Sequence, residues 1–186
     1  MEIILASASP RRVQLIKKIE NLQVKVIPSN AEEKIDNSSP QLLVQSLAYQ
    51  KAKEVHDREG GKVIGADTVV VDGDKVLGKP KDIEDAERML KSLCGKTHKV
   101  LTGVCLIKES GEFITSVCTT FVSFLPYDKE IITAYLQTKS PLDKAGAYGI
   151  QDKALAPLIE KVEGDLDNVI GFPTQMVSSM IQSFFN

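Results

Sequence analysis

The chain has 186 residues, of which 42% are hydrophobic and 26% are charged, and its formal net charge at pH 7 is -2. This length is sufficient for one large domain or two small lobes with a buried core. The near-neutral charge excludes a general attraction to nucleic acid or to an anionic membrane, so an anionic ligand must be bound by a local cluster of basic side chains.

Three cysteines, Cys94, Cys105 and Cys118, lie far apart in the chain, and its two histidines are isolated from one another. No Cys-x-x-Cys pair is present, so the sequence predicts neither a zinc site nor a disulfide framework and fits a reducing compartment. The apolar stretch at the N-terminus is too short for a signal peptide, and no stretch is long enough to span a bilayer. We therefore expect a cytoplasmic protein that binds neither nucleic acid nor a membrane.

The first half of the chain alternates between strand and helix patterns. A short buried strand at residues 3–6 precedes a helix that Ser9 caps and Pro10 begins. Further strands are predicted at residues 23–27, 63–71 and 75–77, and a helix at residues 41–54. The sequence Asp72-Gly73-Asp74 between the last two strands is typical of a hairpin turn.

The second half contains two long strands and several helices. Its expected helices cover residues 82–93, 128–137 and 173–185, and its expected strands cover residues 99–108, 113–125 and 154–162. The short connection Glu109-Ser110-Gly111-Glu112 predicts that the two long strands pair antiparallel. Together these patterns predict an α/β protein in which a mixed, twisted sheet is flanked by helices in two lobes.

Asp67 stands inside the apolar, β-branched stretch of residues 63–71, where a strand is expected. A carboxylate loses hydration in such a strand, and this loss is tolerated only when a cation, a metal or several hydrogen-bond donors lie nearby. The alternative is an aspartate at a strand edge or bulge, where Gly65 would help a local turn. The residue by itself does not choose between a catalytic carboxylate and a turn residue.

The segment Ser7-Ala8-Ser9-Pro10-Arg11-Arg12 connects the first strand to the first helix. Free N–H groups at a helix start, two serine hydroxyls and two arginines all offer donors to an anion. Arginines in a first turn oppose the helix dipole, so their presence favours a phosphate-bearing ligand over a pair of solvated surface side chains. The chain has no P-loop and no Gly-x-Gly-x-x-Gly motif, which excludes the standard P-loop and dinucleotide-binding proteins.

Other polar candidates follow in the next segments. Lys51 lies near the end of an expected helix, and Lys79 follows the hairpin that carries Asp67. Each lysine alone would be an ordinary surface residue. Glu32 and Glu33 lie in a polar stretch, where solvated glutamates are the plainer interpretation, but one of them together with Asp67 could bind a hard divalent cation.

The loop at residues 141–151 interleaves glycines and alanines with Tyr148 and Gln151. Small residues suit a loop whose backbone approaches a ligand closely, although a tight turn between lobes would also use the glycines. The amide of Gln151 offers both a donor and an acceptor, which suits recognition of a base edge. The spacing alone does not choose between these two interpretations.

These segments, in this order, resemble the Maf family of nucleotide pyrophosphatases over almost the whole chain. The matching strings are Leu5-Ala6-Ser7-Ala8-Ser9-Pro10-Arg11-Arg12, Gly65-Ala66-Asp67-Thr68-Val69-Val70, Leu77-Gly78-Lys79-Pro80, Thr102-Gly103-Val104, Asp143-Lys144-Ala145-Gly146-Ala147-Tyr148-Gly149-Ile150-Gln151, Glu163-Gly164-Asp165, Asn168-Val169 and Gly171-Phe172-Pro173. The resemblance implies one domain over residues 1–186, with the two-lobed α/β fold of the inosine triphosphate pyrophosphatases and an active site in the groove between the lobes. It also implies a homodimer.

The resemblance further implies hydrolysis of a nucleoside triphosphate to the monophosphate and pyrophosphate, with Mg²⁺ or Mn²⁺ as cofactor. Asp67 matches the family's general base, although the sequence leaves open whether it acts as base, as metal ligand with Glu33, or as both. Lys51 and Lys79 match positions that stabilise charge on the phosphates. The matching substrate-binding positions are Ser7, Arg11, Arg12, Glu33, Thr68, Lys144 and Gln151.

Arg11, Thr68 and Gln151 match the positions linked to substrate choice, and their combination resembles the branch that acts on dTTP and UTP. Two stretches depart from the family pattern: residues 152–157 replace a glycine-rich segment, and Leu166-Asp167 replace an aromatic and a small polar residue. Both departures bear on the choice of substrate more than on the reaction. The alternatives are a purine-directed pyrophosphatase that acts on ITP, XTP or 7-methyl-GTP, and a non-catalytic nucleotide-binding regulator of cell division.

Overall fold

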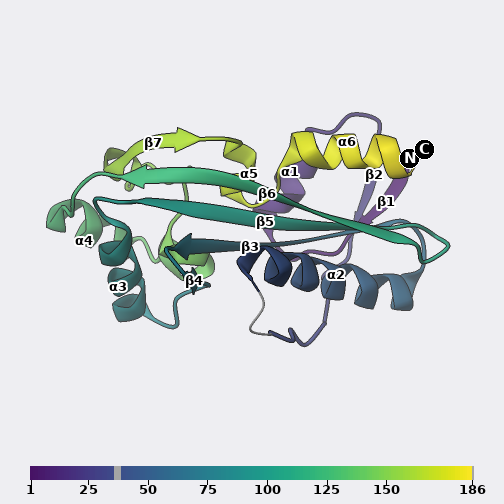
Figure 1. Cartoon of the computed structure of the whole chain (residues 1–186), viewed down its shortest axis with the longest axis horizontal. Helices are drawn as coiled ribbons and strands as arrows, with labels where there is room; N and C mark the ends of the chain where they lie inside the picture. Colours follow the sequence, from purple (N-terminus) through teal and green to yellow (C-terminus); the bar gives the residue numbers. More distant parts are fainter. Residues whose placement is uncertain (36–38, 186) are drawn as a thin grey trace. The chain divides into compact units, whose positions relative to one another are not determined.

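The computed structural model describes residues 1–35 and 39–185 and shows a mixed α/β fold (Figure 1). The strands are β1 (Glu2–Leu5), β2 (Gln23–Val26), β3 (Val63–Asp72), β4 (Lys75–Leu77), β5 (Thr97–Ile107), β6 (Phe113–Phe124) and β7 (Ile159–Glu163). The α-helices are α1 (Pro10–Ile16), α2 (Pro40–Glu59), α3 (Ile83–Leu93), α4 (Lys129–Gln137), α5 (Leu166–Ile170) and α6 (Thr174–Phe184). Short 3₁₀ turns cover Ser140–Asp143, Ala145–Ala147 and Ala156–Leu158.

The strands form one mixed sheet in the order β2-β1-β3-β5-β6-β7, and β4 pairs with β3. β1 runs parallel to β2 and β3, whereas β3 and β4 are antiparallel. β5 and β6 are also antiparallel, because Lys108 N donates to Glu112 O near one end of the pair and Phe124 N donates to Lys96 O near the other. The predicted mixed α/β sheet with flanking helices is therefore confirmed.

Two elements differ from their expected bounds by five residues, whereas the other expected elements agree to within one or two residues. α2 continues past its expected end to Glu59, where Gly60 leaves the helix with a positive φ of 68°. The strand expected at residues 154–162 begins only at Ile159. Pro157 has no N–H for a sheet ladder, so the chain makes a 3₁₀ turn there before the strand starts.

The chain divides into two compact units, and β3, β5 and β6 each run from one unit into the other. The first unit comprises Met1–Thr68, Thr102–Cys118 and Gly171–Asn186, and the second comprises Val69–Leu101 and Thr119–Ile170. The first unit therefore holds α1, α2 and α6, and the second holds α3, α4 and α5. Within the described ranges, none of these helices has both the length and the apolar character needed to cross a membrane.

In the first unit α2 lies against one face of the sheet, and α1 and α6 lie on the opposite face (Figure 1). Two glycines on neighbouring strands permit the close approach of α2. A Cβ on Gly65 would lie 2.3 Å from Ala48 O, and one on Gly103 would lie 2.2 Å from Val44 O. α2 therefore rests directly on the backbone of β3 and β5. The buried apolar side chains around this contact are Ile4, Ala6, Ala48, Ala52, Val55, Val63, Cys105 and Ile107.

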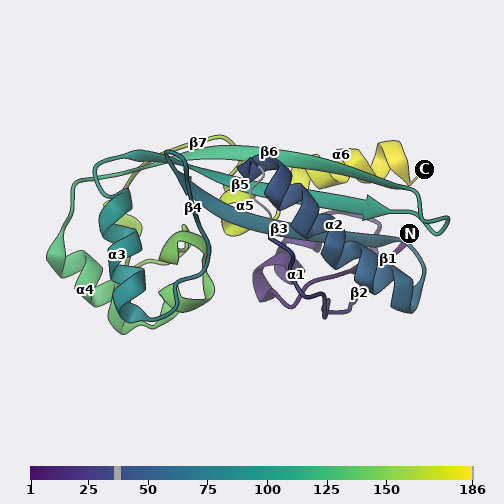
Figure 2. The ribbon, with the colours of Figure 1, turned by 60° about the horizontal axis from the view of Figure 1, so that its bottom comes forward.

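In the second unit α3 presents one apolar face to the core. This face consists of Ala86, Met89, Leu90 and Leu93. α3 packs against α4 and against the 3₁₀ turns of residues 140–147 (Figure 2). The core of the second unit therefore supports the loop that carries Lys144 and Gln151.

Candidate active site

Asp67 lies in the middle of β3, with its side chain on the face that α2 covers. Alternation along the strand places Gly65 and Asp67 on this face and Thr68 on the other. β3 is flanked by β1 and β5, and the Asp67 side chain is only 13% exposed. The structure thus places Asp67 inside β3, a strand with a neighbour on each side in the sheet order, and Gly65 serves the helix contact instead of a turn.

Lys51 connects Asp67 to a second carboxylate. Its Nζ lies 2.5 Å from Asp67 Oδ1 and 2.8 Å from Glu33 Oε1. Lys51 projects from α2, whose close contact with Gly65 brings the helix within reach of the strand. The structure therefore selects Glu33, and not Glu32, as the acidic neighbour, and it supplies the cation that a buried carboxylate requires.

Glu33 and Asp67 offer carboxylate oxygens around a point that already holds a cation, the ammonium group of Lys51. Hard oxygen donors of this kind suit Mg²⁺ or Mn²⁺, which take one or two protein carboxylates and complete their shell with water and phosphate. Among the described residues, no three or more His, Cys, Asp or Glu side chains gather into an all-protein metal site. The two carboxylates suit such a cation by their chemistry, and its binding by Glu33 and Asp67 stays a prediction.

The opposite face of β3 carries a hydrogen-bonded network around Thr68. Thr68 Oγ1 lies 3.0 Å from Thr102 Oγ1, and Arg12 Nη2 donates to Thr68 Oγ1 (3.1 Å). Arg12 Nε donates to Gly171 O (2.9 Å). This network ties α1, β3, β5 and the segment before α6 together, so Arg12 and Thr68 have a framework role, and their contact with substrate stays a prediction.

Arg12 also shows how charge is distributed in the first unit. Burial lowers the pKa of its guanidinium from the ordinary value, whereas Asp67 raises it; Arg11 acts in the same direction as burial, and Glu33 opposes it. The guanidinium stays charged, because the ordinary pKa of arginine is far above neutral pH. Arg11, Arg12 and Lys51 thus bring an excess of positive charge to two carboxylates, which suits an anionic substrate.

Two serines build the connection between β1 and α1. Ser7 Oγ accepts the N–H of Ser9 (3.1 Å), and Ser9 Oγ accepts the N–H of Arg12 (3.5 Å). Pro10 occupies the first helical position. The predicted helix start is therefore confirmed. Ser7 is buried (5% exposed), and phosphate binding by Ser7 and Arg11 stays a prediction.

Lys79, Lys144 and Gln151 belong to the second unit. Lys79 is exposed just after β4, and its neighbour Gly78 accepts the N–H of Gly146 through the carbonyl oxygen (2.9 Å). This hydrogen bond joins the Lys79 segment to the loop that carries Lys144 and Gln151. The predicted site residues are therefore divided between the two units: Lys79, Lys144 and Gln151 belong to the second unit, and the others belong to the first.

Lys144 is buried (8% exposed) and fully engaged by its own loop. Its Nζ donates to Ser140 O (2.7 Å), Ser140 Oγ (2.8 Å) and Asp143 Oδ1 (2.7 Å). An ammonium group has three donors, so these contacts give Lys144 a place in the structure of the loop. A contact between Lys144 and substrate stays a prediction.

Thr102 and Gly171 also contact the predicted site residues, although the sequence predicts no role for either of them. They complete the network of Arg12 and Thr68. A threonine in an apolar strand and a glycine carbonyl give no polar pattern from which a site could be read. The available signal is that both lie in strings that resemble the Maf family.

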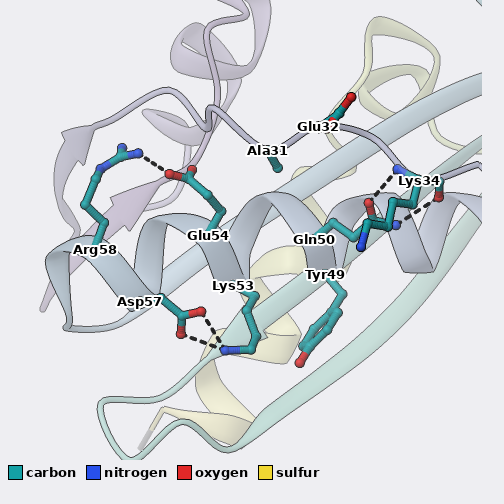
Figure 3. A pocket seen from close by; sticks show the side chains of 9 residues that line it. All are labelled: Ala31, Glu32, Lys34, Tyr49, Gln50, Lys53, Glu54, Asp57 and Arg58. Atoms are coloured by element: carbon teal, nitrogen blue, oxygen red, sulfur yellow. Dashed lines mark hydrogen bonds and ion pairs between the residues drawn. The ribbon is translucent and has the colours of Figure 1, made fainter.

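A cavity of about 530 Å³ lies between α2 and residues 31–34 (Figure 3). Its lining residues are Ala31, Glu32, Lys34, Tyr49, Gln50, Lys53, Glu54, Asp57 and Arg58. Four of its charged side chains form two ion pairs, Lys53 with Asp57 (2.7 Å) and Arg58 with Glu54. Because Asp67 is not among the lining residues, this cavity is distinct from the carboxylate centre.

Gln50, in the wall of this cavity, fastens the segment of Glu33 to α2 (Figure 3). Its Oε1 accepts the N–H of Lys34 (2.9 Å), and its Nε2 donates to Lys34 O (3.1 Å). One helical turn further, Glu54 Oε2 accepts the N–H of Asn30 (2.9 Å). α2 therefore holds both ends of this segment and so determines where Glu33 lies.

Two solved structures share this fold over nearly the whole chain. The Ham1 protein of Staphylococcus aureus has a TM-score of 0.59 at 15% sequence identity, and the match covers 98% of this chain and 99% of that chain. A HAM1 protein from Coxiella burnetii has a TM-score of 0.56 at 13% identity, with the same coverage. At these identities the likeness shows the fold alone.

Relatives found by sequence are much more similar. The dTTP/UTP pyrophosphatase of Thermococcus gammatolerans is 49% identical over 175 residues, which cover 94% of this chain and 92% of the relative. The dTTP/UTP pyrophosphatase of Acetivibrio thermocellus is 46% identical over 195 residues, covering 99% of this chain and 96% of the relative. The family model described as Maf-like protein matches residues 2–184. The chain therefore belongs to the Maf family.

Proposed function

We propose that this protein is a nucleoside triphosphate pyrophosphatase that hydrolyses dTTP and UTP to the monophosphate and pyrophosphate, in a house-cleaning role for the nucleotide pool. The observation that carries the proposal is the pair of contacts from Lys51 to Asp67 and Glu33. A largely buried carboxylate on a central strand, with a cation and a second carboxylate in contact, is typical of a catalytic centre. Membership of the Maf family and the names of the similar relatives support the substrate.

The proposed reaction is an attack of water on the α-phosphorus. A bond forms between the water oxygen and phosphorus, the bond to the bridging oxygen breaks, and its electron pair leaves with pyrophosphate. Asp67 takes the proton of the attacking water. Lys51 contacts Oδ1 of Asp67, whereas no hydrogen bond from the described residues engages Oδ2, so Oδ2 is the oxygen that accepts this proton.

Charge on the phosphates is stabilised by lysine and arginine side chains in this proposal. Lys51 and Arg11 of the first unit are assigned this role, and Lys79 is assigned it on the family resemblance alone. A divalent cation bound by Glu33 and Asp67 would supply further charge neutralisation. Lys51 keeps these two carboxylates close together, and both must be close together to bind the same cation.

Recognition of the base is assigned to Gln151 in the proposal. Thymine and uracil present an N–H group between two carbonyl oxygens. The amide of Gln151 carries a donor and an acceptor and is exposed, so it can pair with both kinds of group. Hypoxanthine and guanine also present an N–H group beside a carbonyl oxygen, so the preference for pyrimidine nucleotides is supported by the names of the similar relatives and not by this contact.

The decisive variant is Asp67→Asn, which keeps the size of the side chain and removes its basicity. We expect pyrophosphate release from dTTP to fall by about a thousandfold, the typical contribution of a general base. Binding of dTTP, measured by calorimetry, should stay within a few-fold of the wild-type value. Near-normal turnover by Asp67→Asn would contradict the proposal.

The substrate assignment is tested by pyrophosphate release from dTTP, UTP, ITP and 7-methyl-GTP at equal concentrations. The proposal expects the two pyrimidine nucleotides to react fastest. Faster release from ITP or 7-methyl-GTP would identify a purine-directed enzyme. Binding without release at any concentration of Mg²⁺ or Mn²⁺ would identify a non-catalytic nucleotide-binding protein.

We further propose that the protein is a homodimer located in the cytoplasm, where its nucleotide substrates occur. The support for the dimer is the family resemblance. Light scattering should then give a mass close to twice the chain mass of 20.4 kDa. A mass equal to that of one chain would contradict the dimer and leave the reaction unaffected.

A further inference from the structure

We infer that Tyr135 and Asp152 form a clamp that positions Gln151, an inference that rests on the proposed role of Gln151 in base recognition. Gln151 lies at the tip of a tight turn that runs from Gly149 to Asp152. The N–H of Asp152 donates to Gly149 O (3.0 Å) and closes this turn. Contacts that hold Gly149 and Asp152 in place therefore also hold the backbone of Gln151 in place.

Both ends of the turn bind the same hydroxyl group. Tyr135 Oη accepts the N–H of Gly149 (3.0 Å) and donates to Asp152 Oδ2 (2.7 Å). Tyr135 lies on α4 and is fully buried. Burial and the contact with Asp152 raise the pKa of this phenol above its ordinary value, so it keeps the proton that it donates.

The Asp152 carboxylate is held from further sides. Ser140 Oγ donates to Asp152 Oδ2 (2.9 Å), and Lys144 Nζ lies 3.6 Å from the same oxygen. The packing leaves no space at Gly149, because a Cβ there would lie 2.9 Å from Asp152 Oδ2 and 2.7 Å from Lys144 Cε. The carboxylate therefore anchors the turn to α4 and to the preceding loop at once.

The side chain at the tip has the opposite character. Gln151 is exposed, whereas the Asp152 side chain beside it is only 18% exposed. A rigid backbone under an exposed amide reduces the ordering cost when the amide binds a base. Tyr135 and Asp152 are therefore positioning residues: they act on substrate through Gln151 and do not touch the reacting atoms.

The test uses Tyr135→Phe, which keeps the buried ring and removes only the hydroxyl. We expect kcat/KM for dTTP and UTP to fall about tenfold, mainly through KM, because the N–H of Gly149 and the carboxylate of Asp152 lose their shared partner. In a Gln151→Ala background the same change should have almost no further effect, since its effect passes through Gln151. Tyr127→Phe is the matched control, because Tyr127 is exposed, and it should match the wild type.

Asp152 provides a second, independent pair of variants. Asp152→Asn keeps an oxygen that accepts from Tyr135 and should stay within about twofold of the wild-type kcat/KM, whereas Asp152→Ala should reproduce the loss caused by Tyr135→Phe. The inference is overturned if Tyr135→Phe costs the same factor with and without Gln151. It is also overturned if Tyr135→Phe and Asp152→Ala lower only the unfolding temperature and leave KM unchanged.

Failure of the inference and failure of the proposed function give different results. Pyrophosphate release by the wild-type protein tests the function alone. The affinity for dTTP, measured by calorimetry for the same variants combined with Asp67→Asn, tests the clamp without turnover. An approximately tenfold weaker affinity that disappears in the Gln151→Ala background supports the clamp, and an unchanged affinity overturns it.

Discussion

Lys51 is the cation that compensates two carboxylates of the first unit. It contacts Asp67 and Glu33, and both would otherwise be anions near each other with little hydration at Asp67. Removing one partner of a largely buried ion pair costs more than the pair itself contributes, because the remaining charge stays desolvated. The stability of the first unit and the chemistry proposed for it therefore rest on the same ammonium group.

We expect Lys51→Met to lower the free energy of unfolding by about 2 kcal/mol, below the cost of breaking a fully buried pair. The expected loss is smaller than that for a fully buried ion pair because the two side chains are partly exposed, Lys51 by 18% and Asp67 by 13%. Urea denaturation at pH 7 measures the change. Lys53→Met, on the same helix, removes an ion pair between exposed side chains and should have no measurable effect. An equal decrease in the free energy of unfolding in both variants would contradict a stabilising role for the ion pair between Lys51 and Asp67.

For individual residues, the sequence predicts which residue types the site contains better than it predicts which of them contact one another. A carboxylate in an apolar strand requires a cation, and Lys51 was among the few candidates. The residues alone did not choose between Glu32 and Glu33, and only the family resemblance indicated Glu33, because the choice depends on how Gln50 fastens the backbone of Lys34 to α2. Two adjacent glutamates in a polar stretch look alike until the segment is placed against a helix.

α2 is the element that positions the centre, and it does so through the two glycines beneath it. Gly65 and Gly103 lie on neighbouring strands, and neither has room for a side chain. The helix therefore lies as close to the sheet as backbones allow, and Lys51 reaches Asp67 without spanning a layer of apolar side chains. The sequence showed Gly65 two residues before Asp67 and left a local turn as one of two interpretations, because helix contacts from a distant segment leave no local pattern.

We expect Gly65→Ala to lower the free energy of unfolding by about 2 kcal/mol, because the added methyl group must push α2 away from β3. The same shift should reduce pyrophosphate release, since Lys51 moves with the helix. Gly78→Ala is the matched control for stability, because a Cβ at Gly78 meets no atom within 4 Å. A stable and fully active Gly65→Ala protein would contradict the role assigned to this contact.

The elements themselves were largely predictable from the sequence. The cap Ser9 and Pro10 predicted α1, and apolar spacing predicted α3, whose N-cap in the structure is Asp82. α5 was missed, because it is a single short turn that starts on hydrogen bonds to Asp165 Oδ1 and not on an apolar stripe. The strand that ends at Glu163 was expected to begin at residue 154 but begins at Ile159. The apolar run continues through residues 154–159, so its pattern does not show that Pro157 delays the start of the strand.

For the whole molecule, one buried histidine links folding to pH. His98 is 2% exposed in β5 and lies 2.8 Å from Tyr148 Oη through Nε2. Burial lowers the pKa of His98 to about 4, against a smaller opposing effect of Asp72. In the unfolded chain a histidine has a pKa near 6.5, so at mildly acidic pH the unfolded state binds a proton that the folded state excludes.

The stability contributed by neutral His98 is therefore fully present above about pH 6.5 and is lost as the pH falls toward 4. We expect the free energy of unfolding to fall by about 2 kcal/mol from this residue alone between pH 7 and pH 5. His98→Gln cannot titrate in this range, so urea denaturation at both pH values should show a smaller decrease for the variant. Parallel pH profiles for the two proteins would contradict the assignment.

The ion pairs of Lys51 also bear on how the protein can be handled. Because the ammonium group serves as a built-in counter-ion for Asp67 and Glu33, the folded chain does not depend on an added metal to neutralise them. We therefore expect folding to be independent of the proposed divalent cation, unlike in small proteins whose core is organised by zinc. Under this proposal a chelator should stop hydrolysis while leaving the unfolding temperature where it was, and adding the cation back should restore hydrolysis.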